Sequence, residues 1–218
     1  MRERTILFNG AMVRAILSGA KSQTRRAVKP RYPCEIEERD DGSLWPWFPD
    51  YVTGGEWDGW VPCPFGQPGD RLWVRETWAD LTATHGRPWE KKNPTTGLYE
   101  RGLRPFLWYA ADGDQPDMGG GEINREPWRS STSMPRSACR LVLEVTDVRV
   151  ERLQAISEAD AQREGAGDNV DYTRNRTYRD DFRDIWTSTG GDWDANPWVW
   201  VIGFKVIDQQ AKPEVGNA

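Results

Sequence analysis

The stretch GAKSQTRR, at residues 19–26, decides how this chain is interpreted. Before it, apolar residues recur at three- and four-residue spacing, which predicts an amphipathic helix over residues 9–19. Gly19 suits the end of that helix, because glycine adopts the left-handed backbone conformation at little cost. Lys21 and Thr24 then lie just past the helix, where irregular backbone would let both side chains turn into a cleft.

A single carboxylate far downstream, Glu164, belongs to a second pattern, LQAISEADAQREG at residues 153–165. The pattern contains a Ser-x-x-Asp pair typical of a capping box, and Gly165 suits the end of the helix. The sequence therefore predicts a short helix over residues 157–164, with Glu164 at its last position.

Together these two patterns, in this order, resemble the signatures of the ASCH domain, a small β-barrel of the PUA-like superfamily. The first matches Gly-x-Lys-x-x-Thr-x-Arg, and the second matches the family's Ile-Ser-x-x-x-Ala-x-x-Glu-Gly helix. The segment PGDRLWV, at residues 68–74, is similar to a strand of that barrel, and LFNGAMVRAIL, at residues 7–17, is similar to the start of larger, bacteriophage-type ASCH proteins. The resemblance covers the first thirty residues, the strand near 70–78, and nearly all of 136–207.

The resemblance implies an activity, the hydrolysis of the acyl amide of N4-acetylcytidine, with catalytic residues that match Lys21, Thr24 and Glu164. A threonine hydroxyl is a weak nucleophile and needs a neighbouring base. Lys21 can be that base only if burial or a nearby cation lowers its pKa. Alternatively, Glu164 activates a water while Lys21 polarises the carbonyl or donates the proton. The sequence leaves both assignments open.

Four further residues are predicted to bind the substrate. Arg26, the last position of the first motif, suits a ligand clamp, although a structural ion pair suits it nearly as well. A cytosine ring needs a stacking partner and hydrogen bonds to its Watson–Crick edge. Trp78 is the candidate stacking residue, and Glu76 or Asn9 would meet the donors of the base.

The fold class expected is α+β: a small PUA-like (ASCH) barrel with flanking helices and two long, loop-rich insertions. We expect one domain over residues 1–208, with insertions at about 30–68 and 81–135, and a flexible tail at 209–218. The order of helices and strands fits this class better than a parallel α/β sheet. Besides the two helices above, a third is expected near residues 178–186. Strands are expected at residues 71–78, 104–110, 140–150, with a bulge near Asp147, and 197–207.

Composition limits the classes of partner. The chain has 29 basic and 34 acidic residues, a net charge of −5, which argues against coating a nucleic-acid duplex. A nucleoside or modified base is the expected partner, and RNA is the other that the resemblance allows. No apolar run approaches the roughly 20 residues that span a bilayer, so a cytoplasmic protein without a membrane partner is expected. The three cysteines are widely spaced, and neither a metal nor a cofactor is expected.

Two other functions compete with hydrolysis. A non-catalytic PUA-like module that binds RNA or a modified base would explain the thirteen tryptophans without a tuned lysine. Ribonuclease activity ranks third. Histidine is the commonest general acid–base for that chemistry, and the only histidine, His85, lies far in sequence from both motifs. The sequence fixes neither the acyl group nor the oligomeric state.

Overall fold

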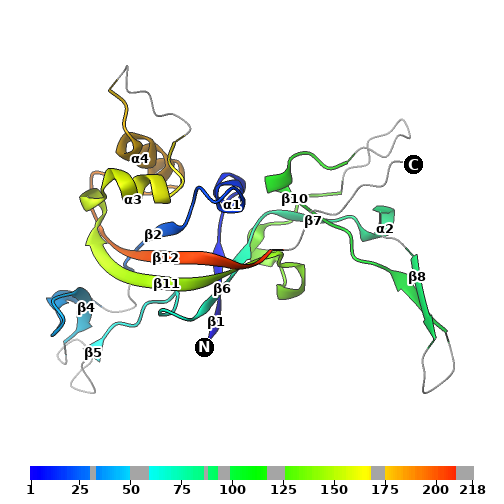
Figure 1. Cartoon of the computed structure of the whole chain (residues 1–218), viewed down its shortest axis with the longest axis horizontal. Coiled ribbons are helices and arrows are strands. Elements are labelled where there is room, and N and C mark those ends of the chain that lie inside the picture. The colour runs from blue at the N-terminus through cyan, green and yellow to red at the C-terminus, as the bar shows by residue number, and fades with distance from the viewer. Residues whose placement is uncertain are drawn as a thin grey trace.

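The computed structural model describes most of the chain (Figure 1). The described residues are 1–29, 33–49, 59–85, 88–92, 99–116, 126–167 and 175–209.

Five strands form the central sheet, in the order β1-β6-β11-β12-β2. Their bounds are β1 Glu3–Leu7, β2 Gln23–Ala27, β6 Arg71–Arg75, β11 Leu141–Arg152 and β12 Trp198–Gln209. β1 runs parallel to β6, and the other neighbours are antiparallel. Within the described residues β1 and β2 are the edges of this sheet, so the expected closed barrel is not confirmed. The mixed α+β class is confirmed.

β11 and β12 pair along almost their whole length and curve together (Figure 1). The register of the pair shifts twice, between Val142 and Leu143 and between Val145 and Asp147. The second shift confirms the bulge that the sequence predicts near Asp147. Bulges bend a strand and increase its twist, which accounts for the curvature.

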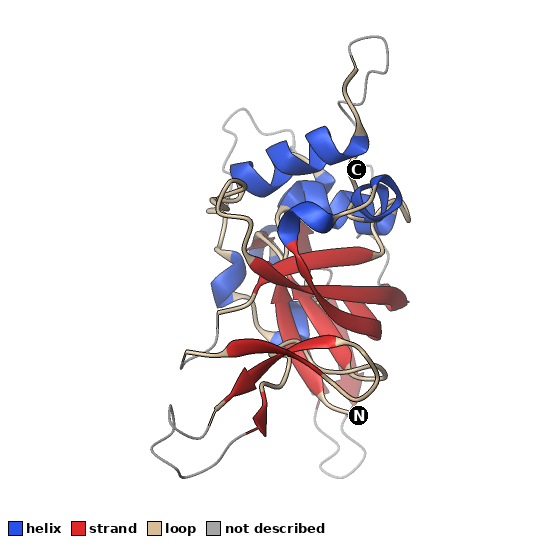
Figure 2. Cartoon of the chain, turned by 90° about the vertical axis from the view of Figure 1, so that its left-hand side faces the viewer, coloured by secondary structure: helices blue, strands red, loops and turns tan. Residues whose placement is uncertain are grey.

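The two faces of the sheet have different coverings, because successive strand residues point to opposite sides. On β12, Trp200 and Ile202 lie in the main core, whereas Val199 and Val201 pack under the helices with Phe182. Those helices are α3, Glu158–Arg163, and α4, Tyr178–Ser188. Figure 2 shows most of the helices gathered along one side of the strands.

α1 spans Gly10–Leu17 and begins as the sequence predicts. The side chain of Asn9 caps it by accepting a hydrogen bond of 2.9 Å from the backbone N–H of Met12. Gly19, with a φ of +79°, lies just past its end. The expected irregular backbone after this helix is wrong: residues 23–27 form β2, so Thr24 is held on a strand.

The region expected as the first insertion contains a second, three-stranded sheet. Its strands are β3 Glu35–Glu38, β4 Leu44–Phe48 and β5 Gly59–Trp60. Trp45 of β4 packs edge-on against Trp200 with 4.9 Å between the ring centroids. This contact joins the small sheet to the main core.

The region expected as the second insertion contains two antiparallel pairs. These are β7 Trp78–Asp80 with β10 Leu107–Tyr109, and β8 Pro88–Lys92 with β9 Tyr99–Leu103. The strand expected at 104–110 is therefore confirmed in shorter form. Short helices complete the described part: α2 Thr82–His85, η2 Ala110–Asp112, η3 Ser131–Ser133, η4 Arg136–Ala138 and η5 Leu153–Ala155. The division into one domain with two insertions and a tail stays a prediction.

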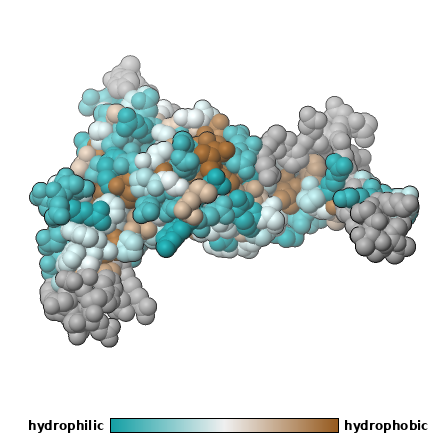
Figure 3. All heavy atoms as spheres, turned by 60° about the horizontal axis from the view of Figure 1, so that its bottom comes forward, coloured by the Kyte–Doolittle hydropathy of each residue, from teal (hydrophilic) through white to brown (hydrophobic). Residues whose placement is uncertain are grey.

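Hydrophilic side chains cover most of the face shown in Figure 3. Within the described part, no helix combines the length and the apolar character that crossing a bilayer requires.

We expect Leu143→Ala to lower the free energy of unfolding by about 2–5 kcal/mol. Leu143 lies on β11 between β6 and β12 and has no exposed surface, so truncation leaves a cavity. Chemical denaturation measures the change. The matched control is Leu103→Ala on β9, where the side chain is exposed and the expected loss is within about 0.5 kcal/mol. Equal losses for the two variants would show that the core is not centred on β11.

Candidate active site

A pocket of about 470 Å³ lies along the outer edge of β2, between α1 and α4. Both motifs reach it, since Lys21, Thr24, Arg26 and Glu164 all line it. Apolar side chains supply the opposite wall: Met12, Phe182, Ile185 and Trp186. The structure thus brings together the three residues predicted to be catalytic and the predicted clamp.

Lys21 enters the pocket because the chain turns back on α1. Its backbone N–H donates to the carbonyl oxygen of Ala15, and its side chain is almost fully buried. The Lys21 ammonium donates to both the backbone oxygen and the Oε2 of Glu164, each at 2.8 Å. Two of the three hydrogen-bonding directions at the nitrogen are therefore used by one residue.

Glu164 is positioned as the C-cap of α3. Gly165 follows with a φ of +88°, and a Cβ there would lie 3.1 Å from the Cβ of Ala15 and 3.3 Å from that of Lys21. Only glycine allows this close approach, which confirms the predicted end of the helix. The predicted helix start is also confirmed, as the Ser157 hydroxyl accepts from the backbone N–H of Asp160.

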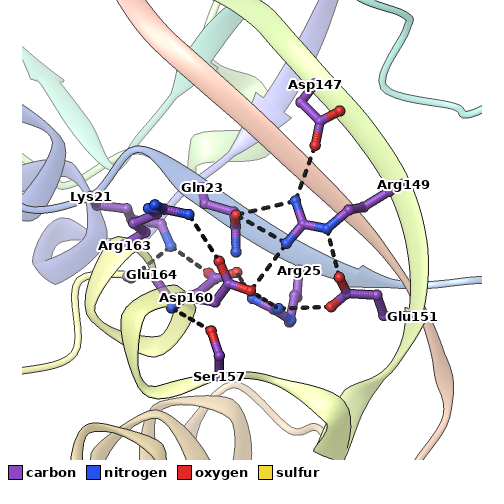
Figure 4. A network of polar contacts seen from close by, with 10 residues as sticks. All are labelled: Lys21, Gln23, Arg25, Asp147, Arg149, Glu151, Ser157, Asp160, Arg163 and Glu164. Atoms are coloured by element: carbon purple, nitrogen blue, oxygen red, sulfur yellow. Dashed lines mark hydrogen bonds and ion pairs between the residues drawn. The ribbon is translucent and has the colours of Figure 1, made fainter.

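Arg25 holds the other carboxylate oxygen of Glu164. Its guanidinium reaches Oε1 of Glu164 at 3.1 Å, Glu151 at 3.0 Å and Asp160 at 3.4 Å. Arg149 shares the last two carboxylates, at 2.6 Å and 3.1 Å. Figure 4 shows these side chains converging beneath the edge of β2.

Thr24 and Arg26 are two residues apart on β2, so their side chains lie on the same face of the strand. They pair with Ile202 and Trp200 on β12. Thr24 is buried, and in the described part of the chain its hydroxyl has no hydrogen-bond partner. The Arg26 guanidinium lies over the ring of Phe8 and donates to the backbone oxygen of Leu7 at 2.6 Å. Its Nε is buried without a partner among the described residues.

Burial lowers the pKa of Lys21 below its ordinary value of 10.5. The Glu164 carboxylate opposes this shift by charge and by hydrogen bonding, while Arg26 and Arg25 add to it. Burial also lowers the pKa of Arg26, against the attraction of Glu164. A guanidinium stays protonated at any physiological pH, so of these two cations only Lys21 can lose its charge.

The other three predicted binding residues lie outside the lining of this pocket. Asn9 caps α1 and borders a neighbouring cavity that Glu164 also lines. Glu76 is buried in a bidentate ion pair with Arg140, with both distances 2.9 Å. Trp78 packs in a separate core cluster with the Arg129 guanidinium over its ring.

Trp186 was not identified from the sequence as the tryptophan that lines this pocket, although the sequence predicts the helix on which Trp186 lies. The spacing of apolar residues marks Phe182 and Trp186 as one face of α4, and nothing local tells which strand that face covers. Gly191 is the clearest clue in the sequence to the position of Trp186. A Cβ at residue 191 would lie 2.3 Å from Nε1 of Trp186, so only a glycine leaves room for the indole.

No family profile and no curated protein matches the chain. Two solved structures are similar to it, and one is an ASCH domain. That structure, from Lactobacillus crispatus, is 14% identical at a TM-score of 0.36 and covers 95% of this chain and 81% of its own. The second, a DUF984 protein from Enterococcus faecalis, is 11% identical at the same TM-score and covers 99% and 86%. A TM-score this low carries no argument about the site, which is described from its own contacts.

We expect Arg25→Met to lower the free energy of unfolding by about 3–5 kcal/mol, because it leaves buried carboxylates without their shared cation. Arg163→Met is the matched control. Arg163 also pairs with Asp160, at 3.2 Å, but its side chain is 61% exposed, so the expected loss is below about 1 kcal/mol. Urea denaturation of both variants measures the difference, and similar losses would contradict a central role for Arg25.

The stability of the protein should depend on pH through Lys21. Its folded pKa is lowered, so between that value and 10.5 the unfolded chain binds more protons, and stability rises with pH. Lys21→Met should lack this rise. The free energies of unfolding of the two proteins, compared at about pH 7 and about pH 10, isolate the effect. Lys205→Met, an exposed control, should follow the wild type. Parallel curves for wild type and Lys21→Met would contradict the lowered pKa.

Proposed function

We propose that the protein is an amidohydrolase that removes the acyl group from N4-acylated cytosine compounds such as N4-acetylcytidine. The observation that carries the proposal is the buried Lys21 amine, with a lowered pKa, in one pocket with the Thr24 hydroxyl, which has no hydrogen-bond partner among the described residues. The motif resemblance names this chemistry, and the geometry supports it without depending on distant structural likeness.

The contacts favour Lys21 over Glu164 as the base. Glu164 accepts from Lys21 at one oxygen and from Arg25 at the other, so both oxygens are already engaged by cations. A neutral Lys21 amine would donate its two N–H groups to Glu164, as the distances indicate, and keep its lone pair free. Glu164 then acts by orienting the amine.

The proposed reaction begins when the Lys21 amine takes the proton of the Thr24 hydroxyl while that oxygen bonds to the acyl carbon. The tetrahedral intermediate collapses, the bond from the acyl carbon to N4 breaks, and the Lys21 ammonium returns the proton to N4. Cytidine leaves, and water, deprotonated by the same amine, hydrolyses the acyl-threonine ester. Each proton taken is returned, so the amine ends as it began.

Arg26 and Trp186 are the proposed substrate-binding residues. The partnerless Nε of Arg26 is a buried donor, and a donor left unpaired is costly unless a ligand meets it. The carbonyl oxygen of the acyl group is such a ligand, since it gains negative charge in the intermediate. Trp186 supplies a flat apolar wall for the pyrimidine ring.

A binding module without catalysis remains the second function, and one observation favours it. Lys21, Arg25 and Glu164 satisfy one another at 2.8–3.1 Å, as a purely structural cluster would. Recognition of a modified base would then use only Arg26 and Trp186. The two functions differ in whether Thr24 forms a transient covalent bond to the acyl group.

We expect Lys21→Met, Thr24→Ala and Glu164→Gln each to lower kcat by at least about 100-fold on N4-acetylcytidine, measured by the absorbance change to cytidine. Residues that act as one unit are not additive, so the Lys21→Met, Thr24→Ala double variant should be scarcely slower than the slower single variant.

Two controls separate chemistry from folding. Thr24→Ser keeps the hydroxyl and should retain measurable turnover, and thermal melting shows whether each variant is folded. A chelator should leave the rate unchanged, because no step proposed uses a metal. If the wild type binds N4-acetylcytidine without turning it over, the binding module is the correct function. Losses that multiply in the double variant would contradict the shared mechanism.

A further inference from the structure

A second cavity, of about 840 Å³, lies between the small sheet of β3, β4 and β5 and the β1 and β11 strands of the central sheet. No residue that lines it also lines the Lys21 pocket. Four arginines line it: Arg2 and Arg4 at the start of the chain, Arg39 just after β3, and Arg149 on β11. Neither sequence motif includes any of them.

Arg2, Arg4 and Arg39 differ from Arg149, and from the packed Arg25 and Arg140, in their lack of acidic partners within the described part of the chain. Arg25, Arg140 and Arg149 each form ion pairs with at least two carboxylates. Arg2, Arg4 and Arg39 form none with any described residue. Around this cavity, three guanidinium groups therefore lack an ion-pair partner among the described residues, in a chain with a net charge of −5. Arg4 donates one hydrogen bond, of 3.1 Å, to the backbone oxygen of Pro64.

The carboxylates that line the same cavity are already engaged. Asp41 accepts from both the backbone N–H and the hydroxyl of Ser43, at 2.9 and 2.6 Å. Asp70 accepts from two backbone N–H groups, at 2.6 and 3.3 Å. Asp147 forms an ion pair of 3.0 Å with Arg149. The free donors of the cavity are therefore cationic, and its anions are occupied.

Arg39 is held in place by tryptophan rings rather than by an acid. Its guanidinium carbon lies 3.8 Å from the ring centre of Trp45 and 5.0 Å from that of Trp60. Stacking fixes the plane of the group and leaves its hydrogen-bonding edges available. The Nε atoms of Arg39 and Arg4 are both buried without a hydrogen-bond partner among the described residues.

We propose that this cavity binds a nucleotide, with Arg2, Arg4 and Arg39 on the phosphate and Trp60 against the base. Guanidinium groups match phosphate oxygens in pairs, and a phosphate would satisfy the donors that the chain leaves unpaired. Trp60 is 37% exposed and offers a flat surface suited to a base of any identity. The phosphate comes either from a free nucleotide or from a short single strand, which present the same chemistry.

The proposal does not rest on the amidohydrolase function. Adenine ligands test the nucleotide cavity separately from the Lys21 pocket, because the Lys21 pocket is proposed to take cytosine. The probes are therefore adenosine 5′-monophosphate, adenosine, inorganic phosphate and a short oligoadenylate, titrated by calorimetry into the full chain. We expect the nucleotide to bind at least about 10-fold more tightly than adenosine, as charge-assisted hydrogen bonds to the phosphate require.

Arg39→Gln should weaken binding of adenosine 5′-monophosphate by at least about 10-fold. Arg104→Gln makes the same change of charge at an exposed position after β9 and should leave binding unchanged. Arg2→Gln, also at an exposed position, decides the matter if Arg39→Gln does not fold. Tighter binding of the oligoadenylate than of the mononucleotide would identify a single strand as the source of the phosphate, and equal binding a free nucleotide.

Three results would overturn the proposal. The first is the absence of binding of either phosphate-bearing adenine probe by the wild type. The second is equal affinity for adenosine and its monophosphate, which would show that the arginines do not bind the phosphate. The third is unchanged affinity in both Arg39→Gln and Arg2→Gln, or an equal loss in Arg104→Gln, which would place binding elsewhere.

Discussion

The burial of one carboxylate, that of Glu164, determines how the ends of three segments meet. A buried charge is costly unless it is paired, and Glu164 is paired at both oxygens, with Lys21 and Arg25. The pairing ties the C-terminus of α3 to β2 and to the turn after α1. Gly165 makes it sterically possible, because a side chain there would push against Lys21. The Lys21 pocket is a consequence of this arrangement, since it opens where the three segments converge.

The same interaction limits what the pocket can do. Both oxygens of Glu164 accept hydrogen bonds from cations, so the proposed function assigns the reactive role to Lys21, whose pKa depends on the balance between burial and its partner. A charged Lys21 would present a third N–H to the pocket and act as an electrostatic group. A neutral Lys21 would present a lone pair. One contact geometry is therefore compatible with both proposed functions, and the protonation state of a single nitrogen distinguishes them.

Local patterns predicted the parts of the site that local physics controls. The Asn9 cap, the turns at Gly19 and Gly165 and the bulge near Asp147 depend on a few neighbouring residues, and the structure confirms each. β2 was not predicted, because four of its five residues, 23–26, are polar or charged and show no alternation with apolar residues. Their partners are set only in the folded chain. Trp186 was missed for the same reason: the choice of strand that α4 covers is made by packing between segments far apart in sequence. Distance along the chain, more than residue type, decided what could be foreseen.

The position of β2 at an edge adds main-chain groups to the site. The carbonyl oxygen of Ser22 accepts from the N–H of Phe204, and the N–H of Val28 donates to the oxygen of Trp198. In an antiparallel pair, residues that bond to the neighbouring strand alternate with residues that bond outward. The backbone N–H and C=O of Arg25 therefore point away from β12, toward the pocket. An N4-acyl cytosine presents an N–H beside a ring nitrogen acceptor, so one residue of an edge strand offers the complementary pair. Under the proposed function, the polar edge strand, which has no neighbouring strand on this side in the described part of the chain, would give the pocket a means to recognise a base.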